Sequence, residues 1–292
     1  MELNSEIIHT PPRDAATVVM LRDGPSGLEV FLLKRHGLSD VLGGAYVFPG
    51  GKLDAADGEL DAHAHLDQSL AEFHGALVEA KTDALTAAAL HVAAVREAFE
   101  ESGILFALGA TAVHAAQATA LLRTGRAFDE VLAEMALRLQ TRSLVPWSRW
   151  ITPKVPMVTN KRFDTRFFIA QVPADQIAQH DNHEATASVW LPPRLALAQH
   201  RDGDIELAPP QIMSLAHLSR YKNVTEAMAA ARSRPPPLIE PEPFMHEGSR
   251  VICYPGDERH SVSQRALPGP TRLRYINKRF EPVGGFDALF ED

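Results

Sequence analysis

The residues best suited to chemistry lie at positions 96–104, Arg-Glu-Ala-Phe-Glu-Glu-Ser-Gly-Ile. Successive residues of an α-helix are rotated by about 100°, so the carboxylates of Glu97, Glu100 and Glu101 would share one face. Small and apolar residues between positions 88 and 99 fall on the opposite face, where they can pack into a core. The pattern predicts a helix that buries one side and presents three carboxylates on the other.

This arrangement is locally unfavourable. Like charges three and four residues apart repel each other, and glutamates just before a helix-ending glycine, here Gly103, oppose the helix dipole. A hard divalent cation such as Mg²⁺ or Mn²⁺ would reverse both effects, because it prefers carboxylate oxygen. Arg96, four residues before Glu100, is placed to hold one carboxylate. The alternative interpretation is a solvated acidic helix end.

A second informative segment precedes the helix. Gly50 and Gly51 follow a strand-like Tyr-Val-Phe-Pro, and Asp57 lies six residues after Gly51. Together with residues 96–104, this pattern resembles the Nudix box, G-x5-E-x7-R-E-U-x-E-E-x-G-U, in which U is a bulky aliphatic residue. Here 38 residues separate Asp57 from Arg96 where the family usually has 7, which predicts an insertion over residues 58–88.

The coenzyme A diphosphatase branch of the Nudix hydrolase superfamily carries an insertion at this place, and the chain resembles that branch over most of its length. Further matching stretches include residues 146–153, 162–168, 207–211 and 254–257, and Glu184 lies six residues before Trp190. The resemblance implies a Nudix fold and metal-dependent cleavage of a nucleoside-linked diphosphate. With coenzyme A or its acyl esters, the products would be 3′,5′-ADP and (acyl-)4′-phosphopantetheine.

The resemblance also implies roles for individual residues. Glu97 and Glu101 are expected to hold Mg²⁺ or Mn²⁺, with Glu100 sharing a second ion and the Gly51 carbonyl completing the site. Glu184 is expected to be a further ligand or the base that orients water, with a loop carboxylate of no role as the alternative. The expected catalytic residues are Arg96, Glu97, Glu100 and Glu184, and Gly50 and Gly51 are expected to lie against the substrate.

Residues 162–167 alternate charged or polar side chains with phenylalanine and threonine, as in a strand whose two faces differ. Arg162 and Arg166 therefore lie on one face together with Asp164. We expect this arginine pair to bind substrate phosphate, since the guanidinium fork suits it. A surface face with a local ion pair is the alternative. For Trp147 and Trp150 the choice is between stacking on a base or acyl chain and packing in the core.

The elements that must position these residues follow from local patterns. Strands are expected near residues 15–22, 28–34, 46–48, 162–172, 186–191, 250–254 and 271–280, and helices at 86–102, twice within 111–139, and at 209–221 and 224–232. The irregular mixture predicts an α+β (mixed α/β) protein with a mixed sheet between helices. We expect one domain over residues 1–292, with helical insertions and a C-terminal extension at 235–292.

Composition limits the class of partner. The net charge of −8 disfavours nucleic acid and anionic membranes, and no apolar run reaches the length of a membrane span. A single cysteine, Cys253, excludes an internal disulfide, and the acidic residues 1–6 do not resemble a signal peptide, so a cytoplasmic location is expected. A homodimer is a family-level expectation. The alternatives in function are cleavage of NADH, ADP-sugars or dinucleoside polyphosphates, and a catalytically silent nucleotide sensor.

Overall fold

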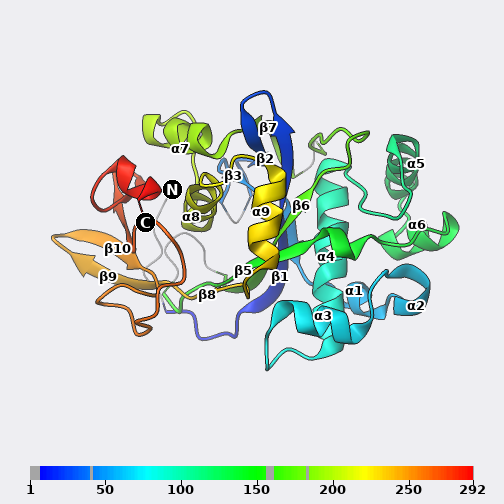
Figure 1. Ribbon diagram of the computed structural model, residues 1–292, viewed down its shortest axis with the longest axis horizontal. Helices are drawn as coiled ribbons and strands as arrows, with labels where there is room; N and C mark the ends of the chain where they lie inside the picture. Colours follow the sequence, from blue (N-terminus) through cyan, green and yellow to red (C-terminus); the bar gives the residue numbers. More distant parts are fainter. Residues whose placement is uncertain (1–6, 40–41, 156–160, 182–183, 292) are drawn as a thin grey trace.

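The computed structural model describes residues 7–39, 42–155, 161–181 and 184–291. Residues 1–6, which bear on the expected location, lie outside these ranges. Within them, a mixed sheet of eight strands stands between two groups of helices (Figure 1). Its strands are β1 (Arg13–Gly24), β2 (Gly27–Arg35), β3 (Tyr46–Val47), β4 (Gly50–Lys52), β5 (Val145–Ile151), β6 (Phe163–Gln171), β7 (Ala185–Leu191) and β8 (Leu238–Ile239). The predicted mixed α/β class is confirmed.

The centre of the sheet is built on β1. It pairs in parallel with β6 and antiparallel with β2 and β4, while β5 continues the sheet beyond β6. The side chains of β1 alternate between the two faces. Ala16, Val18 and Met20 belong to one buried cluster, and Val19 and Leu21 belong to the other. Each face of the sheet therefore has its own apolar core.

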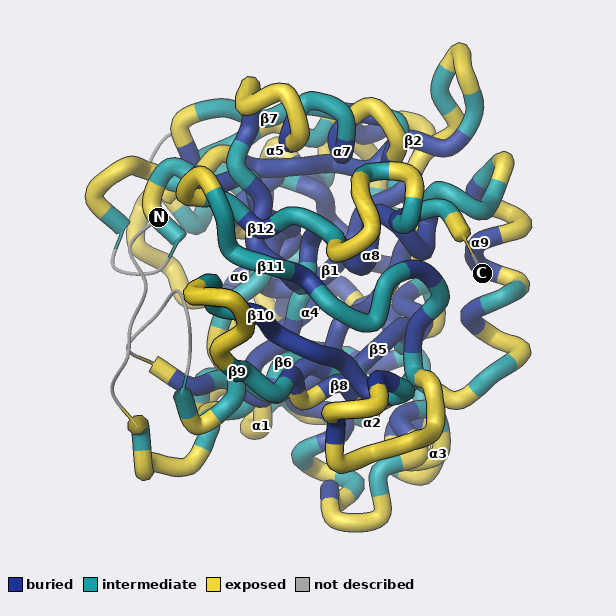
Figure 2. The backbone as a smooth tube through the Cα atoms, turned by 90° about the vertical axis from the view of Figure 1, so that its left-hand side faces the viewer, coloured by how far each residue is buried: buried dark blue, intermediate teal, exposed yellow. Residues whose placement is uncertain are grey.

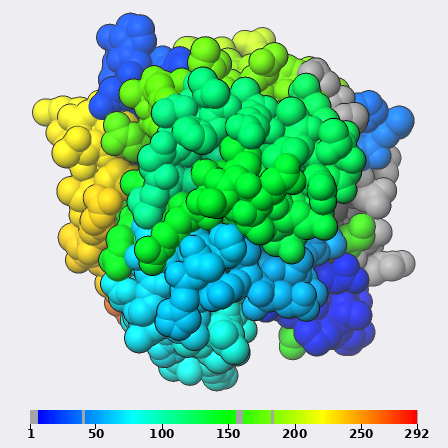
Figure 3. Space-filling model, turned by 90° about the vertical axis from the view of Figure 1, so that its right-hand side faces the viewer, coloured from blue at the N-terminus to red at the C-terminus, as the bar shows by residue number. Residues whose placement is uncertain are grey.

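The first core lies beneath α4 (Ala84–Ser102), which starts at an Asp83 cap and ends where Gly103 adopts a positive φ of 72°. The expected helix at 86–102 is thus confirmed, as are two helices within 111–139. Other helices on this side belong to the insertion or follow α4. They are α1 (Ala55–Glu59), α2 (Ala62–His65), α3 (Leu70–Leu77), α5 (Ala112–Arg123) and α6 (Phe128–Glu134), with a 3-10 turn, η1 (Thr141–Ser143). Figure 3 shows them forming one continuous surface, coloured cyan to green.

The second core lies beneath α7 (Pro193–Asp202), α8 (Pro209–Leu218) and α9 (Val224–Arg232). The C-terminal extension adds a separate sheet in the order β12-β11-β10-β9, whose Ile252, Leu273 and Phe280 join the same core. Figure 2 shows β10 as its buried strand and β9 as its more exposed one. Its elements are β9 (Glu242–His246), β10 (Ser249–Cys253), β11 (Arg272–Ile276), β12 (Arg279–Pro282) and the 3-10 turn η2 (Phe286–Phe290).

Two local expectations fail for identifiable reasons. The expected strand at 271–280 is a hairpin, because Asn277 and Lys278 take positive φ angles of 52° and 62° and turn the chain between β11 and β12. Strand β5 is not among the strands expected from the sequence, and its Pro146 is a residue that sheets tolerate poorly. The sheet accommodates Pro146 beside a register shift in the pairing of β5 with β6. Among the described helices, none is long and apolar enough to cross a bilayer.

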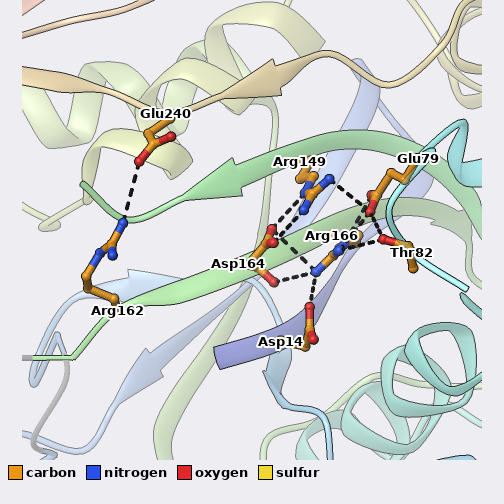
Figure 4. Close-up of polar contacts among 8 residues, drawn as sticks. All are labelled: Asp14, Glu79, Thr82, Arg149, Arg162, Asp164, Arg166 and Glu240. Carbon is orange, nitrogen blue, oxygen red and sulfur yellow. Dashed lines mark hydrogen bonds and ion pairs between the residues drawn. The ribbon is translucent and has the colours of Figure 1, made fainter. Parts of the chain in front are cut away.

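A buried ionic network fastens the insertion to the sheet (Figure 4). Glu79, just after α3, accepts hydrogen bonds from Arg166 Nη2 at 2.7 Å and Thr82 Oγ1 at 2.6 Å, and lies 3.0 Å from Arg149 Nη1. Asp164 accepts two bonds from Arg149 at 2.8 and 2.6 Å, and Arg166 also pairs with Asp14. The network therefore joins the insertion to β1, β5 and β6.

Removing Glu79 should destabilise the protein, because Glu79→Ala takes a buried carboxylate away from the buried Arg166 and the partly exposed Arg149, which still share Asp164. The free energy of unfolding should fall by about 3–5 kcal/mol, measured by urea denaturation. The matched control is Glu134→Ala, on α6, which breaks an exposed pair with Arg126 and should change stability little. Equal effects of the two substitutions would contradict the anchoring role of Glu79.

Candidate active site

The end of α4 is organised around one arginine. Arg96 donates to both oxygens of Asp57, at 2.7 and 2.9 Å, and its Nη1 donates to Glu97 at 2.8 Å and to Glu100 at 3.1 Å. The Asp57 side chain is only 2% exposed, so this bidentate pair is shielded from solvent. The structure thus brings Asp57 to Arg96 across the insertion and confirms the expected pairing of Arg96 with Glu100.

Glu97 lies against the glycine turn. It lines a cavity of about 500 Å³ together with Gly50 and Gly51. A Cβ on Gly51 would stand 2.4–2.7 Å from the Glu97 carboxylate atoms, so a larger residue at this position would force that carboxylate to move. Burial raises the pKa of Glu97 to about 7, and the nearby charges of Glu100 and Glu184 add to the shift while Arg96 opposes it.

Glu101 is the most enclosed of the three helix carboxylates, at 5% exposed. Its Oε2 accepts the Gly50 N–H at 2.9 Å, which ties the end of α4 to β4. Burial raises the pKa of Glu101 to about 8; Glu97 and Glu184 raise it further, while the Gly50 N–H and Arg35 oppose the shift. Glu100 is more exposed, and burial raises its pKa despite its pairing with Arg96.

Glu184 reaches the same cavity from the loop before β7. Its carboxylate is 64% exposed and lies 3.8 Å from Arg35 Nη2. Glu184 and Glu97 therefore face one space although 86 residues separate them in the sequence. Its contacts leave the carboxylate only loosely held.

The two arginines expected at the substrate are placed elsewhere. Arg166, Asp164 and Arg162 are all buried, which rules out the alternative of an exposed surface face. The guanidinium of Arg166 is committed to the network around Glu79, and that of Arg162 donates to the Thr152 carbonyl and lies 3.5 Å from Glu240 (Figure 4). Neither lines the cavity.

The alternation of β6 is therefore as expected, but its opposite face lines the cavity. Phe163, Thr165 and Phe167 face this space, and Trp150 of the neighbouring strand joins them. The cationic residues at the cavity, not anticipated from the sequence, are Arg13, Arg35, Lys52 and Lys161. A basic residue at the end of each of two adjacent strands, Arg13 and Arg35, was the available signal. Trp147, by contrast, is a core residue packed on His217.

The cavity has a volume of about 500 Å³ and two chemically different ends. Glutamates and the glycine turn form one end, and aromatic and proline side chains form much of the other wall. Such a space suits a ligand with a charged group and a flat or apolar group.

The donor set fits a hard divalent cation by its chemistry. Glu97, Glu100 and Glu101 offer only carboxylate oxygens, and their pKa values are raised where carboxylates crowd together with little solvent. Within the described ranges, no three acidic, histidine or cysteine side chains already converge as a ligand set. Glu97 is instead turned toward Arg96, and Glu101 toward the Gly50 N–H.

The raised pKa values predict how pH affects the metal-free protein. Glutamates ionise near pH 4.5 when unperturbed, while folded Glu97 and Glu101 keep their protons to about pH 7 and 8. Between the ordinary pKa of 4.5 and these raised values, the folded state binds more protons than the unfolded state. The contribution of Glu97 and Glu101 to the stability of the folded state therefore falls as pH rises. Urea unfolding in a chelator at pH 5, 6.5 and 8 should show this loss.

Glu101→Gln should flatten that pH dependence, because the neutral amide does not titrate. Added Mg²⁺ or Mn²⁺ should raise the stability of the wild-type protein most at pH 8. Identical pH dependence in the wild type and the variant would contradict the assignment of the shift to Glu101.

Comparison with known proteins identifies the family of this chain. A family model described as the NUDT19 Nudix domain matches residues 12–218. The acyl-coenzyme A diphosphatase NUDT19 of Xenopus laevis is 27% identical over 246 residues, which cover 70% of this chain and 63% of that protein. The chain thus spans less than two thirds of this relative.

Two further similarities agree. The putative nudix hydrolase 7 of Caenorhabditis elegans is 25% identical over 265 residues, covering 89% of this chain and 78% of that protein. The crystal structure of a NUDIX hydrolase from Alicyclobacillus acidocaldarius superimposes with a TM-score of 0.59 at 28% identity, covering 76% of this chain and 97% of that chain. Because the family match extends over more than half of its length, the chain belongs to the NUDT19 Nudix domain family of the Nudix hydrolases.

Proposed function

We propose that this protein is a metal-dependent diphosphatase that cleaves coenzyme A or its acyl esters to 3′,5′-ADP and (acyl-)4′-phosphopantetheine. The observation that carries the proposal is that Glu97, Glu184 and the Gly50–Gly51 turn face one cavity, with Glu101 immediately behind them. The similarity to acyl-coenzyme A diphosphatases supports the choice of substrate.

Nudix hydrolases generally use divalent metal ions. In this chain Glu97 and Glu101, with Glu100, would hold Mg²⁺ or Mn²⁺, which would neutralise the diphosphate and activate water for attack at phosphorus. Arg96 keeps the carboxylates in place through its bonds to Asp57, Glu97 and Glu100. Gly50 and Gly51 allow the substrate to approach the backbone closely.

Glu184 is proposed to orient the attacking water. Glu184 lines the cavity, its carboxylate is well exposed, and among the described residues it makes a long contact with Arg35. In this proposal Arg35 and Lys52, which line the cavity beside Glu97, bind the substrate phosphate. They replace Arg162 and Arg166 in the role that the sequence led us to expect. A cytoplasmic location and a homodimer stay predictions from the sequence.

Glu101→Gln should abolish metal-dependent turnover while the protein stays folded, because the amide loses the charge that a divalent ion requires. The activity should fall by at least about 100-fold, measured by phosphate-ester product release with Mg²⁺ or Mn²⁺. The control is Glu59→Gln, an exposed glutamate on α1, which should retain full activity. Near wild-type activity in Glu101→Gln would remove its role in metal binding.

Incubation with coenzyme A and Mg²⁺ or Mn²⁺ should yield both products in equal amounts, identified by mass. A parallel panel of NADH, an ADP-sugar and a dinucleoside polyphosphate tests the alternative substrates. Preferential cleavage of one of these would overturn the choice of coenzyme A. Tight ligand binding without any product, at any metal concentration, would instead favour a nucleotide sensor.

A further inference from the structure

The cavity wall contains a buried amide that the proposed chemistry does not use. Gln211, in the first turn of α8, lines the cavity and is only 6% exposed. Among the described residues none donates to its Oε1, although this oxygen is fully buried. A buried amide oxygen left without a donor costs about 1–3 kcal/mol. A turn of the side chain that brings this oxygen to the cavity, where a ligand donates to it, would recover that cost.

The backbone fixes the place of this amide. Pro209 and Pro210 occupy the first two helical positions, where their restricted φ angles suit the start of a helix. The backbone at the start of α8 is therefore well defined, and it sets the position from which the Gln211 side chain extends. The two prolines themselves line the cavity. Its side chain can turn either the amide oxygen or the amide nitrogen toward a ligand without breaking a bond to the protein.

The surroundings of Gln211 are flat and apolar. Phe167 lies between Phe48 and Trp150, with ring centroids 6.3 and 6.2 Å apart, and these three rings and Phe163 line the cavity. The indole N–H of Trp150 already donates to Ser148 Oγ at 3.1 Å, so it is not available to a ligand. This wall therefore offers ring surfaces, and Gln211 supplies hydrogen bonding at its border.

We infer that Gln211 reads the adenine base of the substrate while the aromatic wall, with Trp150 at its centre, packs against the plane of the base. A glutamine amide matches the N6 donor and N7 acceptor edge of adenine with two hydrogen bonds. Base stacking on aromatic side chains is favourable for any base, so the amide, not the rings, provides the selectivity.

An acyl chain is a poorer occupant, because it would leave the buried amide unpaired. The inference rests on the proposed function for the presence of a nucleoside in the substrate. It adds the residue that selects the base and the direction in which the substrate lies, with the diphosphate at the glutamates and the base under α8.

The test compares the binding of AMP and IMP in the presence of Mg²⁺, since neither contains a diphosphate to be cleaved. By calorimetry, the wild-type protein should bind AMP roughly 5- to 100-fold more tightly than IMP, whose base lacks the N6 donor. Gln211→Met, similar in size but without the amide, should bind the two equally. Equal binding by the wild type, or an unchanged preference in the variant, would overturn the inference.

Three controls sharpen the result. Trp150→Leu should weaken the binding of AMP and of IMP by the same factor, because stacking does not distinguish the bases. An unchanged affinity in this variant would contradict the role of Trp150. Gln199→Met, on α7 outside the cavity, should leave both affinities unchanged. With the wild-type protein alone, 7-deaza-AMP should bind more weakly than AMP; equal binding would contradict pairing at N7.

Coenzyme A cleavage by the same preparations separates this inference from the proposed function. Cleavage by a wild-type protein that shows no base preference would overturn the role of Gln211 and leave the diphosphatase intact. No cleavage of coenzyme A, with a base preference that is lost in Gln211→Met, would overturn the substrate and support the role of Gln211.

Discussion

The site depends on one guanidinium that makes a cluster of carboxylates compatible with folding. Arg96 is largely buried and contacts Asp57, Glu97 and Glu100, while Glu101 lies beside them with a backbone N–H as its partner. Without this cation, burial and mutual repulsion would favour protonation of the carboxylates or expulsion of the helix end into solvent. Arg96 gains in turn, since its carboxylates raise its own pKa.

The central sheet separates structural ion pairs from the cavity. On one face of β6, Asp164 and Arg166 are joined to Glu79 of the insertion, and on the other face Phe163 and Phe167 line the cavity. The insertion therefore supports the cavity from behind, through strands β5 and β6. The C-terminal extension closes the cavity from the opposite side, where Pro241 and Ile252 contribute to its wall.

The insertion separates Asp57 from Arg96 in the sequence but does not separate these two residues in the structure. The intervening residues fold into α2, α3 and the first turns of α4, so that Asp57 of α1 still meets Arg96 through two hydrogen bonds. The site can tolerate a long insertion because closing a longer loop costs little additional entropy, and the buried Glu79 offsets part of that cost.

Local periodicity in the sequence is enough to predict two features of the site. The three glutamates share a face because a helix repeats every 3.6 residues, and β6 has two chemically different faces because a strand repeats every two. Local patterns do not reveal which face of β6 lines the cavity, because that depends on how Glu79 and the later helices pack against the sheet. The approach of Gln211 to the cavity is likewise not encoded in any local pattern, because it comes from an element distant in the chain, whereas Glu184 was expected at the site from the family resemblance alone.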